Sequence, residues 1–303
     1  MTSVSQRPSV SVGLLVPPPL SMARESAPRR LWNASPLTYF ALVVAVLLSI
    51  YPLYYMFIIA TRSLDTINDV PPPSTPGSAF GDNFQRVLDA DAANFWQGMI
   101  NSVIVASSVT VSVVLFGTLA GFAFAKLRFR GRNGLLLATL ITMMVPTQLG
   151  LIPLWDMMNT IGWYGNILAV IVPFMVSAFG VFMMRQYAAQ AVSDELIEAA
   201  RVDGCSTLRI YWNVVLPALR PAAAVLGLLT FMEQWNSFLW PYAILTPENP
   251  TVQVSLAFLS YAYYIDYSLV FAATAVATVP LVLVFIVFGR QIIGGIMEGA
   301  VKA

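Results

Sequence analysis

Residues 92–125 read AANFWQGMINSVIVASSVTVSVVLFGTLAGFAFA and contain no Asp, Glu, Lys or Arg. An α-helix needs roughly 20 predominantly apolar residues to cross the hydrocarbon core of a bilayer. Hydrocarbon offers no hydrogen-bond partner to the backbone, so a crossing segment must satisfy its own polar groups, as a helix does. This stretch of 34 uncharged residues therefore predicts a membrane-spanning helix.

Further stretches between consecutive charged residues are long enough for the same purpose. They are residues 31–61, 133–155, 157–184, 221–247 (interrupted only by Glu233) and 267–289. Together with residues 92–125 they predict an all-α integral membrane protein of six transmembrane helices. The predicted helices are centred near residues 48, 112, 144, 174, 233 and 279. Residues 249–265 form a stretch of only 17 residues, which we interpret as an interfacial or re-entrant segment at the outer surface.

The composition agrees with a membrane protein and excludes several kinds of site. The chain is 58% hydrophobic and 10% charged, with a mean hydropathy of +0.73, whereas soluble domains carry about 25% charged residues. Histidine is absent and Cys205 is the one cysteine, which excludes histidine metal sites, histidine general bases and an internal disulfide. We expect no catalytic residue, no metal site and no nucleic-acid partner.

The distribution of Lys and Arg indicates the orientation of the chain in the membrane. With the N-terminus inside, 14 of the 16 cations lie in cytoplasmic segments, and only Arg62 and Arg86 fall in outer loops. This is the asymmetry that the positive-inside rule describes. We therefore expect both termini in the cytoplasm. Residues 1–30, which are rich in Pro, Ser and Arg, are expected to form a disordered cytoplasmic tail.

Small residues and prolines inside the predicted spans indicate how the helices can pack against one another. Gly117 and Gly121 form a small-xxx-small pattern that lets helix backbones approach closely. The pattern fits packing within this chain or contact with a partner subunit. Pro146, Pro153 and Pro173 interrupt the third and fourth predicted spans, which is tolerated where neighbouring groups satisfy the freed carbonyls.

The cytoplasmic loop at residues 193–217 has a pattern of its own. Ser193 is a good N-cap, acidic residues follow in the first turn, and Gly204 is a typical helix stop. A second short helix, expected to end at Pro217, carries an apolar stripe of Leu208, Tyr211, Trp212, Val215 and Leu216. The pattern predicts a helix-turn-helix along the inner membrane face. It fits an amphipathic hairpin resting on lipid headgroups or a docking platform for a soluble partner.

The sequence of this loop resembles a motif of a known protein family. Glu198-Ala199-Ala200, Asp203-Gly204 and, thirteen residues after the aspartate, Leu216-Pro217 resemble the EAA loop of binding-protein-dependent ABC importer permeases. Other segments are similar to the carbohydrate, MalG-type branch of that family. They are residues 101–102 (NS), 123–131 (AFAKLRFRG), 152–155 (IPLW), 235–236 (WN) and 299–302 (GAVK). The resemblance extends over residues 36–303.

The resemblance implies a MetI-like transmembrane permease domain over residues 31–303 whose EAA loop fits a groove of an ATP-binding subunit. The residues expected at that contact are Glu198, Ala199, Ala200, Asp203, Gly204, Leu216 and Pro217. It also implies a second homologous permease, two ATP-binding subunits that hold ATP and Mg, and an extracytoplasmic solute-binding protein. This chain would bind no cofactor itself. It would import a sugar, a di- or oligosaccharide, across a bacterial or archaeal cytoplasmic membrane.

The energy source of transport can also be argued from the residues. The chain has two lysines, Lys126 and Lys302, and neither stands in a P-loop, so ATP would be hydrolysed on other subunits. A gradient-driven secondary carrier or channel is the alternative, and such carriers keep ionisable groups within their spans. Glu233 is the one candidate, and the substrate pathway is predicted at Glu233, Gln234, Trp235 and Asn236. We assign Trp240 and Tyr242 to the aromatic belt at the membrane interface.

Overall fold

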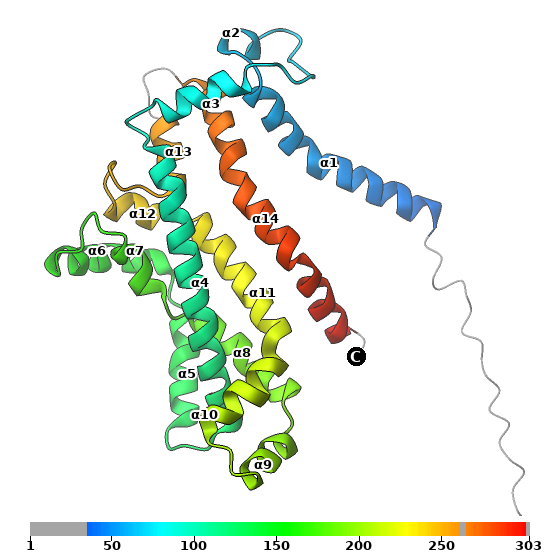
Figure 1. Cartoon of the computed structure of the whole chain (residues 1–303), viewed down its shortest axis with the longest axis vertical. Coiled ribbons are helices and arrows are strands. Elements are labelled where there is room, and N and C mark those ends of the chain that lie inside the picture. Colours follow the sequence, from blue (N-terminus) through cyan, green and yellow to red (C-terminus); the bar gives the residue numbers. More distant parts are fainter. Residues whose placement is uncertain (1–34, 261–264, 301–303) are drawn as a thin grey trace, which may run out of the picture. The chain divides into compact units, whose positions relative to one another are not determined.

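The computed structural model describes residues 35–260 and 265–300 (Figure 1), and side chains up to residue 289. The expected N-terminal tail at residues 1–30 and the end of the GAVK segment lie outside the described residues. The chain divides into two compact units, of which the first ends at Tyr51 and the second begins at Pro52. The regular elements in the described ranges are all helical, as predicted.

Five helical segments are long and apolar enough to cross a membrane. They are α1 (Pro36–Ala60), α4 (Phe95–Lys126), the segment Leu168–Ala191 formed by α7 (Leu168–Ile171), η3 (Val172–Phe174) and α8 (Ala178–Ala191), the segment Thr207–Trp235, and Tyr267–Gly289 of α14 (Tyr267–Ala300). The shorter helices are α2 (Leu64–Ile67), α3 (Phe80–Leu88), α12 (Leu239–Ile244) and α13 (Val252–Ser260). Five of the six predicted spans are thus continuous helices or nearly so.

The third predicted span is broken. α5 (Arg132–Thr142) is followed by η2 (Thr147–Gly150) and α6 (Leu151–Thr160), and the two halves meet at an angle of 89°. The predicted centre, residue 144, lies in the break itself. Pro146 lacks a backbone N–H and disfavours helical geometry at the residue before it. The pair counts as a sixth span only if both halves cross the membrane together.

The fifth span begins earlier in the sequence than predicted. α10 (Thr207–Ile210), η4 (Tyr211–Val215) and α11 (Leu216–Trp235) follow one another without a gap. The predicted span began after Arg220, because the spans were defined as stretches between charged residues. Arg220 instead lies inside α11 with an exposed side chain. Glu233 consequently falls in the last turn of α11 rather than at the middle of a span.

The glycine pattern in α4 serves packing within this chain. α4 packs most extensively against α8 and α11. A Cβ at Gly117 would lie 3.4 Å from the Gly180 backbone, and a Cβ at Gly121 would lie 2.7 Å from the backbone carbon of Met184. Met184 is fully buried at this contact. The two backbones therefore approach as closely as they do because no side chain separates them.

Two polar side chains in the N-terminal half of α4 hold α13 in place. The Asn101 amide donates to Asn249 Oδ1 at 2.7 Å and to the Pro250 carbonyl at 2.8 Å. The Ser102 hydroxyl accepts the backbone N–H of Val252 at 2.8 Å. α13 has nine residues, too few to cross a bilayer. This agrees with the expectation that residues 249–265 do not form a span.

Replacing Gly121 with alanine should destabilise the protein. The new methyl group would meet the Met184 backbone at 2.7 Å, and overpacking of this kind costs about 1–3 kcal/mol. We expect a lower midpoint of thermal unfolding for the purified Gly121→Ala protein in detergent. Gly150→Ala is the control, because a Cβ there meets nothing within 4 Å. Equal midpoints for the two variants would contradict the close packing of α4 on α8.

Candidate functional site

The first helix of the loop at residues 193–217 is α9 (Asp194–Val202). The Ser193 hydroxyl caps it by accepting the backbone N–H of Leu196 at 3.4 Å, as the sequence predicted. A hydrogen bond and the positive charge of Lys126 hold the pKa of Asp194 below its usual value. The pKa of Glu195 is lowered as well, first by its own backbone N–H and then by the Ser193 hydroxyl. The first turn of α9 thus keeps its negative charge, which the helix dipole favours.

The turn after α9 depends on a glycine. Gly204 has φ of +78°, a conformation that glycine adopts at little cost and other residues avoid. Its N–H donates to the Arg201 carbonyl at 3.0 Å, and the Cys205 N–H donates to the Ala200 carbonyl at 2.9 Å. This pair of bonds is the Schellman arrangement that ends helices. It turns the chain sharply into α10, which Ser206 caps.

α9 has one buried face and one exposed face. Ile197 is buried and belongs to the main hydrophobic core, together with the preceding Val192. Glu198, Ala199, Asp203 and Gly204 are exposed, and Ala200 is half-buried. The loop also exposes large apolar side chains. They are Leu196, Val202, Leu208 and Trp212, with exposed fractions of 53%, 88%, 66% and 55%.

The second helix of the loop differs from the prediction in two ways. Pro217 does not end it, because the chain passes from η4 directly into α11. Residues 211–215 form a π-helical turn. This wider turn accommodates Pro217, which has no backbone N–H to donate to the preceding turn. The predicted apolar stripe is also divided. Tyr211 and Val215 are buried in the protein core, whereas Leu208 and Trp212 are exposed.

Two contacts tie this loop to the end of α4. The hydroxyl groups of Tyr211 and Thr118 lie 2.8 Å apart in the buried interior, and the Tyr211 ring packs on Phe122. Nearer the surface, the Lys126 ammonium lies 2.7 Å from Asp194 Oδ1. The Lys126 side chain is only 8% exposed, whereas that of Asp194 is 78% exposed. The last turns of α4 therefore contact both α9 and the π-helical turn at residues 211–215.

The four predicted pathway residues do not share one surface. Glu233 and Asn236 are exposed and Gln234 is half-buried. Trp235 is 1% exposed, stacks on Phe231 and donates its indole N–H to the Ala277 carbonyl at 3.2 Å. Trp235 therefore joins α11 to α14 inside the fold.

The assignment of Trp240 to an aromatic belt is wrong. Its side chain is 7% exposed, and its indole N–H donates to the Ala169 carbonyl at 3.0 Å. A tryptophan can be buried when its ring packs against apolar groups and its indole N–H finds a hydrogen-bond acceptor. The Ala169 carbonyl is that acceptor here. Tyr242 is 42% exposed, and its assignment to the belt stays a prediction.

A groove that the sequence analysis missed lies along α4, α11 and α14. Its volume is about 600 Å³. Most of its lining is apolar, but α4 contributes hydroxyl groups. The hydroxyl group of Thr110 is buried and has no hydrogen-bond partner in the part of the chain that the structure describes. The signal in the sequence is a run of hydroxyl and small residues at helical spacing on one face of α4. The groove is lined by Ser107, Thr110, Val111, Val114, Leu115, Thr118, Tyr211, Leu216, Ala223, Ala224, Gly227, Leu228, Phe231, Val284 and Phe288.

Comparison with known proteins identifies the family. Residues 113–294 match the model of the family described as the inner membrane component of binding-protein-dependent transport systems. The chain belongs to this family. The matched range begins within α4 and includes the whole loop at residues 193–217, the residues around Glu233 and most of α14.

Individual members of the family are similar over nearly their whole length. The arabinooligosaccharides transport system permease protein AraQ of Halalkalibacterium halodurans is 31% identical over 93% of this chain and 100% of its own. The lactose transport system permease protein LacG of Rhizobium radiobacter is 34% identical over 87% of this chain and 95% of its own. A chain from the crystal structure of a bacterial ABC transporter involved in the import of the acidic polysaccharide alginate superimposes with a TM-score of 0.72. It is 25% identical and covers 88% of this chain and 98% of its own.

The contact between Lys126 and Asp194 should hold α9 in place in this family member. We expect Lys126→Glu to speed amide hydrogen exchange in residues 194–202 several-fold, because it places two negative charges together. Asp194→Lys should speed exchange as well, because it places two positive charges together. The double variant Lys126→Glu/Asp194→Lys should restore most of the protection. If the double variant exchanges as fast as the single variants, the ion pair does not fix the helix.

Proposed function

We propose that this chain is the transmembrane permease subunit of an ATP-driven importer for a sugar, and that the loop at residues 193–217 couples it to separate ATP-binding subunits. Membership of the family supports the class of transporter. The observation that carries the coupling role is the exposed surface of α9 and the Gly204 turn, which displays both charged and large apolar side chains. Apolar groups of this size in a polar loop are typical of a protein-binding surface.

Some residues of the loop would contact the partner, and others would hold the loop in position. Glu198 and Asp203 offer carboxylates to the partner, and Ala199 and Ala200 leave room for close approach. Gly204 makes the turn that presents them. Leu216 and Pro217 begin α11, so they connect the loop to a span. Force applied to α9 would reach α4 through Asp194 and Lys126. Force passed across the Gly204 turn to α10 would reach α4 through Tyr211 and α11 through the continuous helix.

Membership of the family and the charge distribution support the proposed assembly. We propose a second homologous permease, two ATP-binding subunits that carry ATP and Mg, and an extracytoplasmic solute-binding protein. Both termini would lie in the cytoplasm of a bacterial or archaeal cell, since 14 of the 16 cations then face inward. This chain would hydrolyse nothing itself, because the P-loops belong to the ATP-binding subunits.

The proposed substrate is a di- or oligosaccharide. The relatives named above transport arabinooligosaccharides and lactose, and the similar solved transporter is involved in the import of a polysaccharide. The groove along α4 suits the wall of a pathway, because it combines apolar surface with hydroxyl groups. Glu233, Gln234 and Asn236 at the end of α11 remain candidates for contact with sugar hydroxyls. Trp235 would act by positioning the end of α11 on α14.

A substitution that strains the backbone of the turn after α9 tests the coupling role. A Cβ at Gly204 meets no atom within 4 Å, so Gly204→Val adds only backbone strain at φ of +78°. That strain is about 1–2 kcal/mol. We expect Gly204→Val to reduce ATP-dependent import in proteoliposomes at least tenfold while the ATP-binding subunits still hydrolyse ATP. Gly204→Asn should be milder, because asparagine tolerates this conformation.

The control is Gly150→Ala, which should import normally. Glu198→Ala should weaken co-purification of the ATP-binding subunits or uncouple hydrolysis from import. Normal import by Gly204→Val and Glu198→Ala would contradict the coupling role of this loop. Import that needs no ATP would instead support a gradient-driven carrier or channel.

A further inference from the structure

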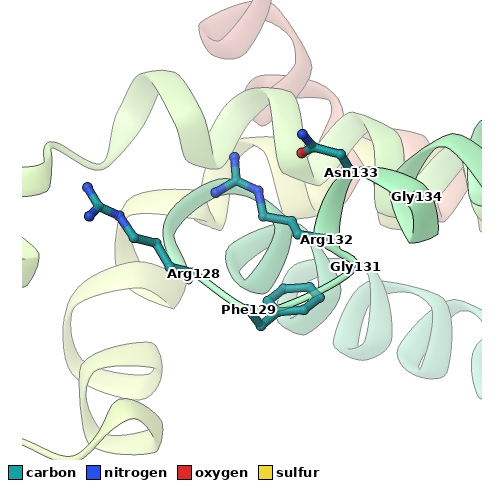
Figure 2. Close-up of a pocket in the computed structure, with 6 residues that line it drawn as sticks. All are labelled: Arg128, Phe129, Gly131, Arg132, Asn133 and Gly134. Atoms are coloured by element: carbon teal, nitrogen blue, oxygen red, sulfur yellow. The ribbon is translucent and has the colours of Figure 1, made fainter.

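The loop between α4 and α5 forms a shallow, open basic pocket. Its volume is about 490 Å³, and it is lined by Arg128, Phe129, Gly131, Arg132, Asn133 and Gly134. Figure 2 shows the side chains of Arg128 and Arg132 extending to the same side of the loop, with the Phe129 ring on the other side in this view. No carboxylate is among the lining residues. The pocket therefore has two positive charges and no negative one.

The Arg132 side chain is held in place while part of its donor capacity stays unused. Its Nη1 donates to the Leu127 carbonyl at 3.2 Å, which fixes the guanidinium across the loop. Its Nε is buried and has no hydrogen-bond partner among the described residues. A buried donor without a partner costs free energy, and a bound acceptor would remove that cost.

Arg128 has no hydrogen bond or salt bridge within the residues that the structure describes. Its charge acts on Asp194, whose pKa is lowered mainly by Lys126 and to a smaller extent by Arg128. Asp194 already pairs with Lys126 at 2.7 Å. The Arg128 guanidinium thus remains available to an anion from outside the chain.

Backbone donors at the start of α5 add to the pocket. Gly131 has φ of +82° and precedes the helix, and the Leu135 N–H returns to the Gly131 carbonyl at 2.9 Å. The N–H groups of Asn133 and Gly134 lie in the first helical turn, where the helix supplies no acceptor. Guanidinium groups together with such N–H groups match the oxygens of a phosphate.

The outward surface of α5 indicates where the phosphate comes from. Leu135, Leu137 and Ile141 are 56%, 58% and 53% exposed, so an apolar surface begins at the pocket and continues along the helix. α5 has 11 residues and is about 16 Å long. This is about half of the hydrocarbon thickness of a bilayer, which is the depth of one leaflet.

We propose that the pocket formed by Arg128, Arg132 and the first turn of α5 binds the phosphate of an anionic phospholipid whose acyl chains lie along α5. A lipid with net negative charge fits better than a zwitterionic one, because its headgroup brings no ammonium group near the two arginines. The proposal needs only that α5 lies against the membrane, and it is independent of the function proposed above.

Lipid binding by the purified full-length chain tests this site. The probes are phosphatidylglycerol, phosphatidylcholine and inorganic phosphate, titrated into delipidated protein in detergent and followed by native mass spectrometry. We expect phosphatidylglycerol to bind in preference to the other two. Arg128→Gln should weaken its binding about tenfold, the loss expected for one charge-assisted hydrogen bond.

The matched control is Arg130→Gln, which removes the same charge from the same loop but from a residue that does not line the pocket. It should leave the affinity within about twofold. Equal losses for the two variants would mean diffuse attraction to a basic loop and would overturn the site. Phosphate binding as tightly as the lipid would overturn the lipid as the source.

A protein ligand is the remaining outcome that would overturn the proposal. In that case, Arg128→Gln would leave lipid binding unchanged and would reduce recovery of the ATP-binding subunits instead. Arg132→Gln is a less clean variant, because its contact with the Leu127 carbonyl also shapes the loop.

Discussion

The close contact between α4 and α8 is the interaction on which the rest of the structure depends. Gly117 and Gly121 bring the two backbones together, and the side chains of Met184 and Leu226 fill the space around them. In a membrane, helix association gains little from the hydrophobic effect, because lipid tails are as apolar as the side chains. Close packing therefore has to supply much of the stability, and α4 becomes the helix against which α8, α11 and α13 are placed.

The position of α4 also explains how a loop at the surface can act on the spans. The C-terminal end of α4 carries Thr118, Phe122 and Lys126, and all of them contact the loop at residues 193–217. That loop continues into α11 without a break in helical structure. The loop is thus linked to α4 by a buried hydroxyl pair and an ion pair, and to α11 by continuous helical structure. The other face of the loop remains exposed, as a contact surface for a partner requires.

The differences between the predicted and observed structure have separate local causes. Charge-free stretches locate apolar segments, but they do not show where a helix begins. Arg220 therefore displaced the predicted start of the fifth span, although an exposed arginine is compatible with a helix. Pro217 was predicted to end a helix, and the π-helical turn before it allows the helix to continue. Trp240 was assigned to the membrane interface, but a free carbonyl at Ala169 gives its indole N–H a partner inside the fold.

The sequence by itself determined that the chain is an all-helical membrane protein, which family it resembles, and where α9 and its glycine turn lie. These features depend on hydropathy, on capping and on the left-handed conformation of Gly204, all of which act over a few residues. Only the tertiary structure decided that Trp235 is a packing residue, that Lys126 pairs with Asp194 and that a hydroxyl-bearing groove follows α4. It also brought Arg128 and Arg132 together at the start of α5. Most of these relations depend on which face of each helix meets its neighbours, and packing between helices distant in the sequence decides that.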